Sequence, residues 1–219
     1  MGITRKPSYR DYWASDPDLH NEFISRLMTV KRFSFLLSHL HLNDNSMQPR
    51  HDSQNLDKLY KLRPLIDNLC NSFSKCYSAH AEVAVDESMV KFQGRSSLKQ
   101  CMRDKPTKRG YKIWMLCDKS GYNLKFQVYT SKVREKRPEK GLAARVVVDL
   151  TNEIQGKNHI VYMDNYFSSY ALFKELKGKQ IFACGTVNPT RKDFPKLQSD
   201  KVLKRGEFDF LVSGDGISV

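Results

Sequence analysis

Two aspartates in this chain, Asp86 and Asp164, each end a short apolar stretch typical of a strand, and they lie 78 residues apart. Asp86 follows Val83–Val85, and Asp164 follows Ile160–Met163. A carboxylate at the end of a strand lies at the open edge of a sheet, where a metal ion can be bound. Two such carboxylates can hold a divalent cation against a phosphodiester. The pattern therefore predicts a metal site for phosphoryl-transfer chemistry.

The residues that directly follow these aspartates are also polar. Glu87 follows Asp86 and Asn165 follows Asp164, and we expect both to orient the metal ligands. Phosphoryl transfer on DNA commonly uses two cations about 4 Å apart. Magnesium suits this chemistry because its oxygen ligands can include phosphate and water. The alternative for each aspartate taken alone is a structural role in a turn or at a strand end.

The formal net charge of +13 is unevenly distributed along the 219 residues. Residues 1–82 hold 11 Lys/Arg against 9 Asp/Glu, whereas residues 83–219 hold 26 against 15. This asymmetry predicts a polyanionic partner for the second part of the chain. The alternative is a well-solvated basic surface.

One segment next to the proposed metal site is especially basic. Residues 91–112 contain eight Lys/Arg and a single acid, Asp104. Such a segment can bind the phosphate backbone without reading the base sequence, although a solvated charged loop is the alternative. The predicted DNA-binding residues are Arg95, Lys99, Arg103, Lys105, Lys108, Arg109 and Lys112.

The periodicity of apolar residues changes near residue 82. Before it, spacing close to 3.6 predicts helices over 19–42 and 55–73, the second interrupted by Pro64 and therefore kinked or divided. After it, alternation predicts short strands, with Lys119–Gly121 as a hairpin turn. The predicted order is strand 82–86, strand 111–118, strand 123–129, helix 141–154, strand 159–163, helix 168–176 and strand 180–187.

This order predicts the fold class. Three early strands joined by short connections can form an antiparallel sheet, and a helix can then return the chain to a strand parallel to the first. The result is an α/β (α+β) fold with a ribonuclease-H-like mixed sheet preceded by a helical region. In that topology Asp86 and Asp164 lie on neighbouring strands at the same edge.

Several function classes lack support in the sequence. We find no phosphate-binding P-loop, so no nucleotide cofactor is expected, and no apolar run approaches the ~20 residues of a membrane span, so no membrane partner is expected. The five cysteines form no C-x-x-C pair, which argues against a zinc ribbon or a redox pair. We expect reduced thiols, most of them buried.

An ordered set of short motifs resembles the piggyBac transposase family over essentially the whole chain. Each motif is weakly specific, but the set in this order is highly specific. The matching segments are Pro7–Trp13, Met28–Phe33, Leu40–Asn45, Val85–Met89, Phe92–Arg95, Lys105–Gly110, Met163–Ser169 and Gly185–Val187.

The resemblance implies a DDE-type, cut-and-paste DNA transposase that uses Mg²⁺ or Mn²⁺. Asp86 and Asp164 match the first two catalytic, metal-binding aspartates of the family by position. Residues 1–82 resemble the first segment of a helical dimerisation and DNA-binding region, residues 83–190 an incomplete catalytic domain, and residues 191–219 the start of a β-rich insertion. The implied partners are transposon-end or target DNA and a second copy of the chain. The implied location is the nucleus, with Lys136-Arg137 compatible with an import signal.

The family's third catalytic aspartate follows the insertion, beyond the part that this chain matches. We therefore expect two of three metal ligands and little catalysis from this chain alone. Two alternatives stay open: a domesticated protein that binds DNA or a partner without catalysis, and a relic without a stable fold of its own.

Overall fold

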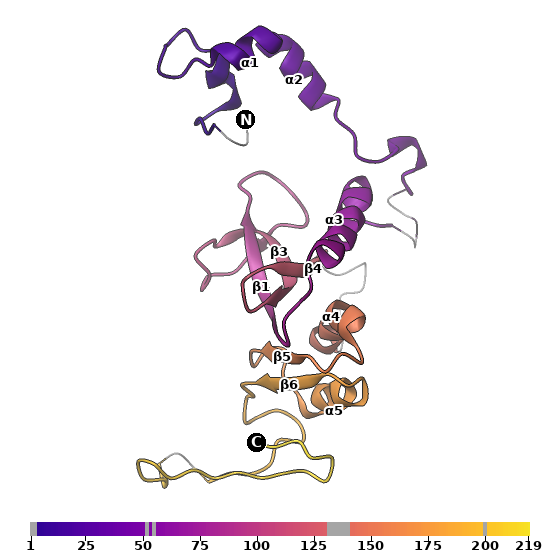
Figure 1. Ribbon diagram of the computed structural model, residues 1–219, viewed down its shortest axis with the longest axis vertical. Coiled ribbons are helices and arrows are strands. Elements are labelled where there is room, and N and C mark those ends of the chain that lie inside the picture. The colour runs from indigo at the N-terminus through magenta and orange to yellow at the C-terminus, as the bar shows by residue number, and fades with distance from the viewer. Residues whose placement is uncertain (1–3, 51–52, 54–55, 131–140, 199–200) are drawn as a thin grey trace. The chain divides into compact units, whose positions relative to one another are not determined.

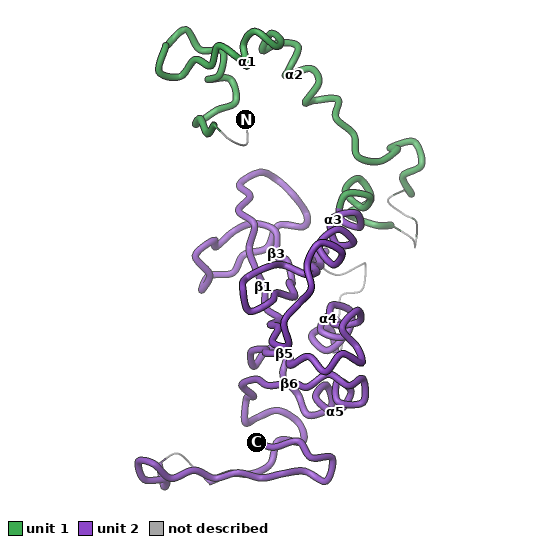
Figure 2. The backbone as a smooth tube through the Cα atoms, in the orientation of Figure 1, with its two compact units in different colours: residues 1–65 green, residues 66–219 purple. Residues whose placement is uncertain are grey.

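The computed structural model describes residues 4–50, 53, 56–130, 141–198 and 201–219 (Figure 1). The chain forms two compact units, residues 1–65 and residues 66–219, which are coloured separately in Figure 2. Within the described residues, no helix has both the length and the apolar character needed to cross a bilayer.

The first unit consists of short helices. They are η1 (Tyr9–Trp13), α1 (Glu22–Leu27), α2 (Val30–Ser38), η2 (Asn45–Met47) and η3 (Tyr60–Leu62). The single helix predicted over 19–42 is wrong, because the chain is extended at Met28 and restarts at Thr29. The Thr29 hydroxyl accepts a hydrogen bond from the backbone N–H of Arg32, which makes Thr29 an N-cap. The indole N–H of Trp13 donates to the Met28 carbonyl at 2.8 Å, which removes that carbonyl from a continuous helix.

Helix α3 (Arg63–Cys76) replaces the longer helix that was predicted over 55–73. Pro64 is the second residue of α3, so it neither kinks nor divides the helix. Proline is tolerated there because the first backbone N–H groups of a helix have no partner within it. At its C-terminal end α3 packs on the sheet: the Tyr122 hydroxyl donates to the Phe73 carbonyl at 3.3 Å.

A six-stranded mixed sheet is the centre of the second unit (Figure 1). The strand order is β2-β3-β1-β5-β6, and β4 also pairs with β3. The β1–β3 and β3–β4 pairs are antiparallel, whereas β1–β5 and β5–β6 are parallel. The predicted ribonuclease-H-like topology is confirmed. The strands are β1 (Glu82–Lys91), β2 (Gln100–Cys101), β3 (Arg109–Asp118), β4 (Asn123–Val128), β5 (Ile160–Met163) and β6 (Phe182–Gly185).

Three further helical segments belong to this unit: α4 (Leu142–Thr151), η4 (Asn152–Ile154) and α5 (Tyr170–Gly178). Ser169 is the N-cap of α5, accepting a hydrogen bond from the Leu172 N–H, and the helix ends at Gly178 as predicted. The apolar faces of α4 and α5 form one core with the sheet. Its fully buried members include Val83, Val85, Leu116, Val146, Val147, Leu150, Val161, Leu172, Leu176 and Ile181.

The hairpin predicted at Lys119–Gly121 is present between β3 and β4. Gly121 has a φ of 85°, which a residue with a side chain rarely adopts. The buried Asp118 carboxylate fixes the start of the turn by accepting the backbone N–H groups of Ser120 and His80, at 2.8 and 2.7 Å.

Residues after β6 contain little regular structure among those described. An antiparallel bridge joins Val212 to Ser218, and Leu211 and Val219 exchange two backbone hydrogen bonds, at 2.9 and 3.0 Å. The segment therefore ends in a short hairpin, in line with the alternation in the sequence. The expectation that most cysteines are buried is wrong, because Cys76, Cys101 and Cys184 are exposed; all five are free thiols.

Candidate metal centre

Parallel pairing of β1 with β5 brings Asp86 and Asp164 to the same edge of the sheet. Val85 pairs with Met163, the last residue of β5. Asp86 follows Val85 within β1, and Asp164 follows Met163. The predicted placement of the two aspartates on neighbouring strands at one edge is confirmed.

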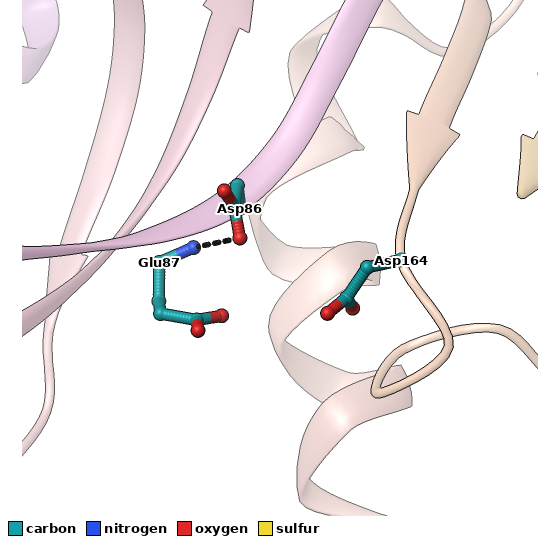
Figure 3. A group of neighbouring side chains, drawn as sticks. All are labelled: Asp86, Glu87 and Asp164. Carbon is teal, nitrogen blue, oxygen red and sulfur yellow. Dashed lines mark hydrogen bonds between the residues drawn. The ribbon is translucent and has the colours of Figure 1, made fainter. Parts of the chain in front are cut away.

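Three carboxylates converge at this edge, as Figure 3 shows. Asp86, Glu87 and Asp164 each offer a carboxylate oxygen, and these oxygens lie within 4.8 Å of one another. We call these three residues the acidic cluster. Successive residues of a strand leave on opposite faces, so Asp86 and Glu87 reach the cluster from different sides of β1. Glu87 was expected to orient metal ligands, and its carboxylate is in fact one of the three groups that could bind the ion.

The loop after β5 holds Asp164 in place through its backbone and its side chain. The Asp164 carbonyl accepts hydrogen bonds from the backbone N–H and the hydroxyl of Ser168, at 3.1 and 2.9 Å. One carboxylate oxygen of Asp164 accepts the N–H of Tyr166 at 3.0 Å. Such local bonds to an aspartate are typical of a tight turn. They lead directly into α5, so the strand, the turn and the helix all position this carboxylate.

Asn165 is the other residue expected to orient the metal ligands, and its backbone carbonyl, not its side chain, makes the contacts that hold the loop after β5. Its carbonyl and that of Tyr166 both accept hydrogen bonds from Nη2 of Arg191, each at 2.8 Å. Among the described residues we find no hydrogen bond from the Asn165 side chain to the acidic cluster. Sequence reasoning missed Arg191, because nothing in the local pattern around it indicates that it reaches back to the loop after β5.

A lysine lies against the acidic cluster. Nζ of Lys105 is 3.2 Å from Oε1 of Glu87 and 3.9 Å from Oδ2 of Asp86. Partial burial by itself lowers the pKa of Lys105, but the hydrogen bond to Glu87 and the charges of the cluster outweigh it and raise the pKa above its ordinary value. Lys105 therefore stays charged in this environment.

The pKa values of the two neighbouring carboxyl groups of β1, Asp86 and Glu87, are shifted in opposite directions. Burial raises the pKa of Asp86 above its ordinary value, the charge of Glu87 adds to the increase, and Lys105 opposes it. Burial also disfavours the charged form of Glu87, but Lys105 and Lys112 outweigh this and hold its pKa below the ordinary value. The side chain of Asp86 is 63% exposed and that of Glu87 only 10%. Glu87 is thus a largely buried carboxyl group whose pKa the neighbouring lysines hold below its ordinary value.

The other predicted DNA-binding residues lie at several places within the basic segment 91–112. Lys112 lies on β3 with Nζ 5.1 Å from the centre of the Tyr166 ring and 5.6 Å from that of Trp114, which is cation–π geometry. Nζ of Lys99 donates to the Gly94 carbonyl at 2.9 Å. Arg95 and Arg103 are exposed. A cavity of about 570 Å³ is lined by Lys91, Phe92, Gln93, Lys99, Pro106, Thr107, Lys108 and Arg109.

Lys136-Arg137, the pair that we associated with nuclear import, lies outside the described residues. Among the predicted DNA-binding residues, Lys105 lies at the acidic cluster, Lys112 lies on β3 beside aromatic rings, and Lys99, Lys108 and Arg109 line the cavity next to β1. This arrangement brings basic side chains and the acidic cluster together in the second unit.

The ribonuclease-H-like sheet is consistent with the fold of a transposase, and comparison with known proteins agrees. The family described as Transposase IS4 matches residues 1–219, and the chain belongs to this family.

Within that class, the chain resembles piggyBac proteins, as the sequence motifs predicted. It is 36% identical to the human PiggyBac transposable element-derived protein 3 over 98% of this chain and 37% of that protein. It is 29% identical to the human PiggyBac transposable element-derived protein 2 over 96% of this chain and 36% of that protein. The chain therefore spans little more than a third of the length of these relatives.

A solved structure also matches. The piggyBac transposase in a synaptic complex with hairpin DNA superposes with a TM-score of 0.73 at 25% identity, covering 91% of this chain and 42% of that chain. The match supports the topology assigned above.

Proposed function

We propose that this chain provides the metal-binding part of a site for DNA strand cleavage and transfer, as in cut-and-paste transposition. The observation that supports this proposal most strongly is the acidic cluster, three carboxylates within 4.8 Å at the edge of a ribonuclease-H-like sheet. The position of Asp86 and Asp164 on paired parallel strands supports a catalytic role for both.

The residues of the acidic cluster fit a hard divalent cation. All three donors are carboxylate oxygens, which Mg²⁺ and Mn²⁺ prefer, and no soft ligand such as a thiolate belongs to the cluster. Asp86, Asp164 and Glu87 would hold the ion. When bound, such an ion supplies Lewis-acid stabilisation of the charge that develops on the phosphoryl oxygens. The chain's own contribution is to fix the carboxylates, through the β1–β5 pairing and the turn after β5.

DNA is the proposed substrate. The second part of the chain is strongly basic, and the basic segment 91–112 borders the acidic cluster through Lys105. The solved structure with the matching fold is a complex with hairpin DNA. Binding through backbone phosphates predicts an affinity that falls steeply with salt concentration.

The resemblance of the sequence to the piggyBac family leads to further proposals about this chain. Residues 1–82 would serve as the first segment of a helical dimerisation and DNA-binding region, with a second copy of the chain as partner. Residues 83–190 would serve as the catalytic domain and residues 191–219 as the start of a β-rich insertion. The proposed location is the nucleus.

The proposal is tested by incubating the purified chain with hairpin or nicked DNA and Mg²⁺ or Mn²⁺, beside Asp86→Ala. Cutting by the chain that falls by roughly a hundredfold or more in the variant supports a cleavage site, since this corresponds to about 3 kcal/mol of transition-state stabilisation. Salt-sensitive DNA binding without cutting, unchanged in Asp86→Ala, would instead support a domesticated binding protein. A cooperative thermal transition excludes a relic without a stable fold.

A further inference from the structure

Lys105 differs from the other predicted DNA-binding residues in its contacts. It is the one among them whose ammonium nitrogen lies within 4.0 Å of carboxylates of the acidic cluster, 3.2 Å from Glu87 and 3.9 Å from Asp86. The loop that holds it is closed by two backbone hydrogen bonds, from Met102 to the Lys108 carbonyl at 2.9 Å and from Lys105 to the Met102 carbonyl at 3.4 Å. The ammonium group is therefore held at the cluster by a folded loop.

This contact has an electrostatic reason. Three carboxylates so close together repel one another, and a neighbouring ammonium group offsets part of their charge. A divalent cation would bind the same oxygens that Lys105 contacts. Lys105 would then face a cation in place of free carboxylates, and its favourable partner would become an anion that enters the site.

The anion that enters a phosphoryl-transfer site is a phosphodiester. Lysine is a compact charge on a flexible stem, so it can exchange one partner for another without a change in the backbone. Nζ of Lys105 lies within reach of the cluster, and its side chain is 33% exposed, so solvent and DNA can also reach it.

We propose that Lys105 exchanges partners: it is the counter-ion of the acidic cluster in the metal-free protein, and in the metal-loaded protein it binds the DNA phosphodiester held at the cluster. This inference rests on the proposed function and assigns Lys105 as a residue that binds the substrate phosphodiester only when metal is present. The remaining basic residues bind flanking phosphates whether or not metal is present.

The chain offers a matched control on the same strand. Nζ of Lys119 is 3.1 Å from Oε2 of Glu82, the first residue of β1, so this lysine–glutamate pair has nearly the same length. Glu82 lies outside the acidic cluster. Lys119→Met therefore removes an equivalent ion pair and an equal charge without touching the cluster.

The first measurement is Mn²⁺ binding, by calorimetry or by electron paramagnetic resonance, to the chain and to Lys105→Met and Lys119→Met. The expected result for Lys105→Met is tighter Mn²⁺ binding, by roughly threefold to tenfold, because a competing cation is gone. Lys119→Met is expected to match the unsubstituted chain, and Lys105→Arg, which keeps the charge, to gain less affinity than Lys105→Met.

The second measurement is DNA binding at several salt concentrations, with and without Mn²⁺, using a hairpin-ended duplex. With Mn²⁺, Lys105→Met is expected to lower the slope of log affinity against log salt by about 0.9, the effect of one lost phosphate contact. Without Mn²⁺ the slope is expected to be unchanged, since Lys105 is then paired with carboxylates. Thermal melting of each variant shows that the fold is retained.

The outcomes separate this inference from the proposed function. If the chain binds Mn²⁺ and Lys105→Met binds it equally or more weakly, the exchange of partners is wrong while the metal site stands. If Lys105→Met lowers the salt slope of DNA affinity equally with and without Mn²⁺, the exchange of partners is also wrong, since Lys105 would then bind phosphate whether or not metal is present. If the unsubstituted chain does not bind Mn²⁺, both the metal site and the inference fail.

Discussion

Val85 of β1 pairs in parallel register with Met163 of β5, and an aspartate of the acidic cluster directly follows each of them. This register is fixed by burial, because Val83, Val85, Val161 and Met163 all point into the core. A slip of one residue would turn these side chains outward and separate the two carboxylates. The hydrophobic pattern of two short strands therefore determines where the metal ligands meet.

Gly185 gives one prediction about this strand pairing. A Cβ at Gly185 would lie 2.3 Å from the Met163 carbonyl oxygen and 2.5 Å from Oγ of Ser168, so Gly185→Ala forces β6 away from the end of β5. We expect a loss of roughly 1–3 kcal/mol in the free energy of unfolding. Urea denaturation measures it.

Gly178→Ala is the matched control, because a Cβ there meets nothing within 4 Å and the residue ends a helix. This variant is expected to be as stable as the unsubstituted chain or slightly more stable. Equal destabilisation by the two substitutions would show that contact with Met163 is not the cause.

Asp118 gives a prediction of pH dependence. Burial by itself would raise the pKa of this carboxyl, but the backbone N–H groups of Ser120 and His80 donate to it and hold the pKa well below its ordinary range. A pKa that is lower in the folded state stabilises the fold above the pH at which the unfolded carboxyl titrates, about 4, and this contribution is lost as the pH falls further.

We therefore expect Asp118→Asn to melt several degrees below the unsubstituted chain at pH 7. The difference should shrink as the pH is lowered from 4 toward 2, because the unsubstituted chain then loses the contribution of the charged carboxylate. Thermal melts followed by circular dichroism across this range are the measurement. A difference that is constant with pH would mean that the charge of Asp118 is not the stabilising feature.

Arg191 gives a prediction about the loop after β5. Its guanidinium binds the carbonyls of Asn165 and Tyr166, so Arg191→Met should loosen the turn that positions Asp164. We expect Mn²⁺ affinity to fall by roughly threefold to tenfold. Removing a group that bonds directly to a metal ligand commonly lowers metal affinity by about tenfold to a hundredfold, and Arg191 acts only on the backbone next to Asp164.

Loss of a positive charge alone would strengthen Mn²⁺ binding, so the sign of the change distinguishes positioning from charge. Lys192→Met, which removes the neighbouring positive charge, is the control. A gain in affinity in both variants would refute the positioning role of Arg191.

The sequence predicted the order and type of β1, β3, β4, α4, β5, α5 and β6 because their strands alternate and their helices have a clear period. It missed β2, because a strand of two residues is too short to show alternation. It predicted that Asp86 and Asp164 share an edge because each directly follows a short buried apolar stretch, although Asp86 itself lies within β1. It did not predict that β1 continues to Lys91, since residues 87–91 are held by pairing with Gly110–Trp114 of β3, which is a long-range contact.

The position of Glu87 was not predicted either, because it also depends on the pairing of β1 with β3, which is distant in the sequence. Its side chain leaves β1 on the face opposite to that of Asp86, so strand alternation gave no indication that the two carboxylates would lie within 4.8 Å of each other. In the first unit, the break at Thr29 was missed because a capping hydroxyl competes with an otherwise continuous apolar period.

The most direct test of the central claim is the Mn²⁺ affinity of the chain beside Asp86→Asn, Asp164→Asn and Glu87→Gln. Glu82→Gln, which removes an acidic group of β1 outside the cluster, is the control. We predict that the chain and Glu82→Gln bind Mn²⁺ with the same affinity, and that each substitution within the acidic cluster weakens binding at least tenfold, as expected for the loss of a carboxylate ligand. Mn²⁺ binding that is unaffected by both Asp86→Asn and Asp164→Asn, or no Mn²⁺ binding by the unsubstituted chain, would contradict the claim.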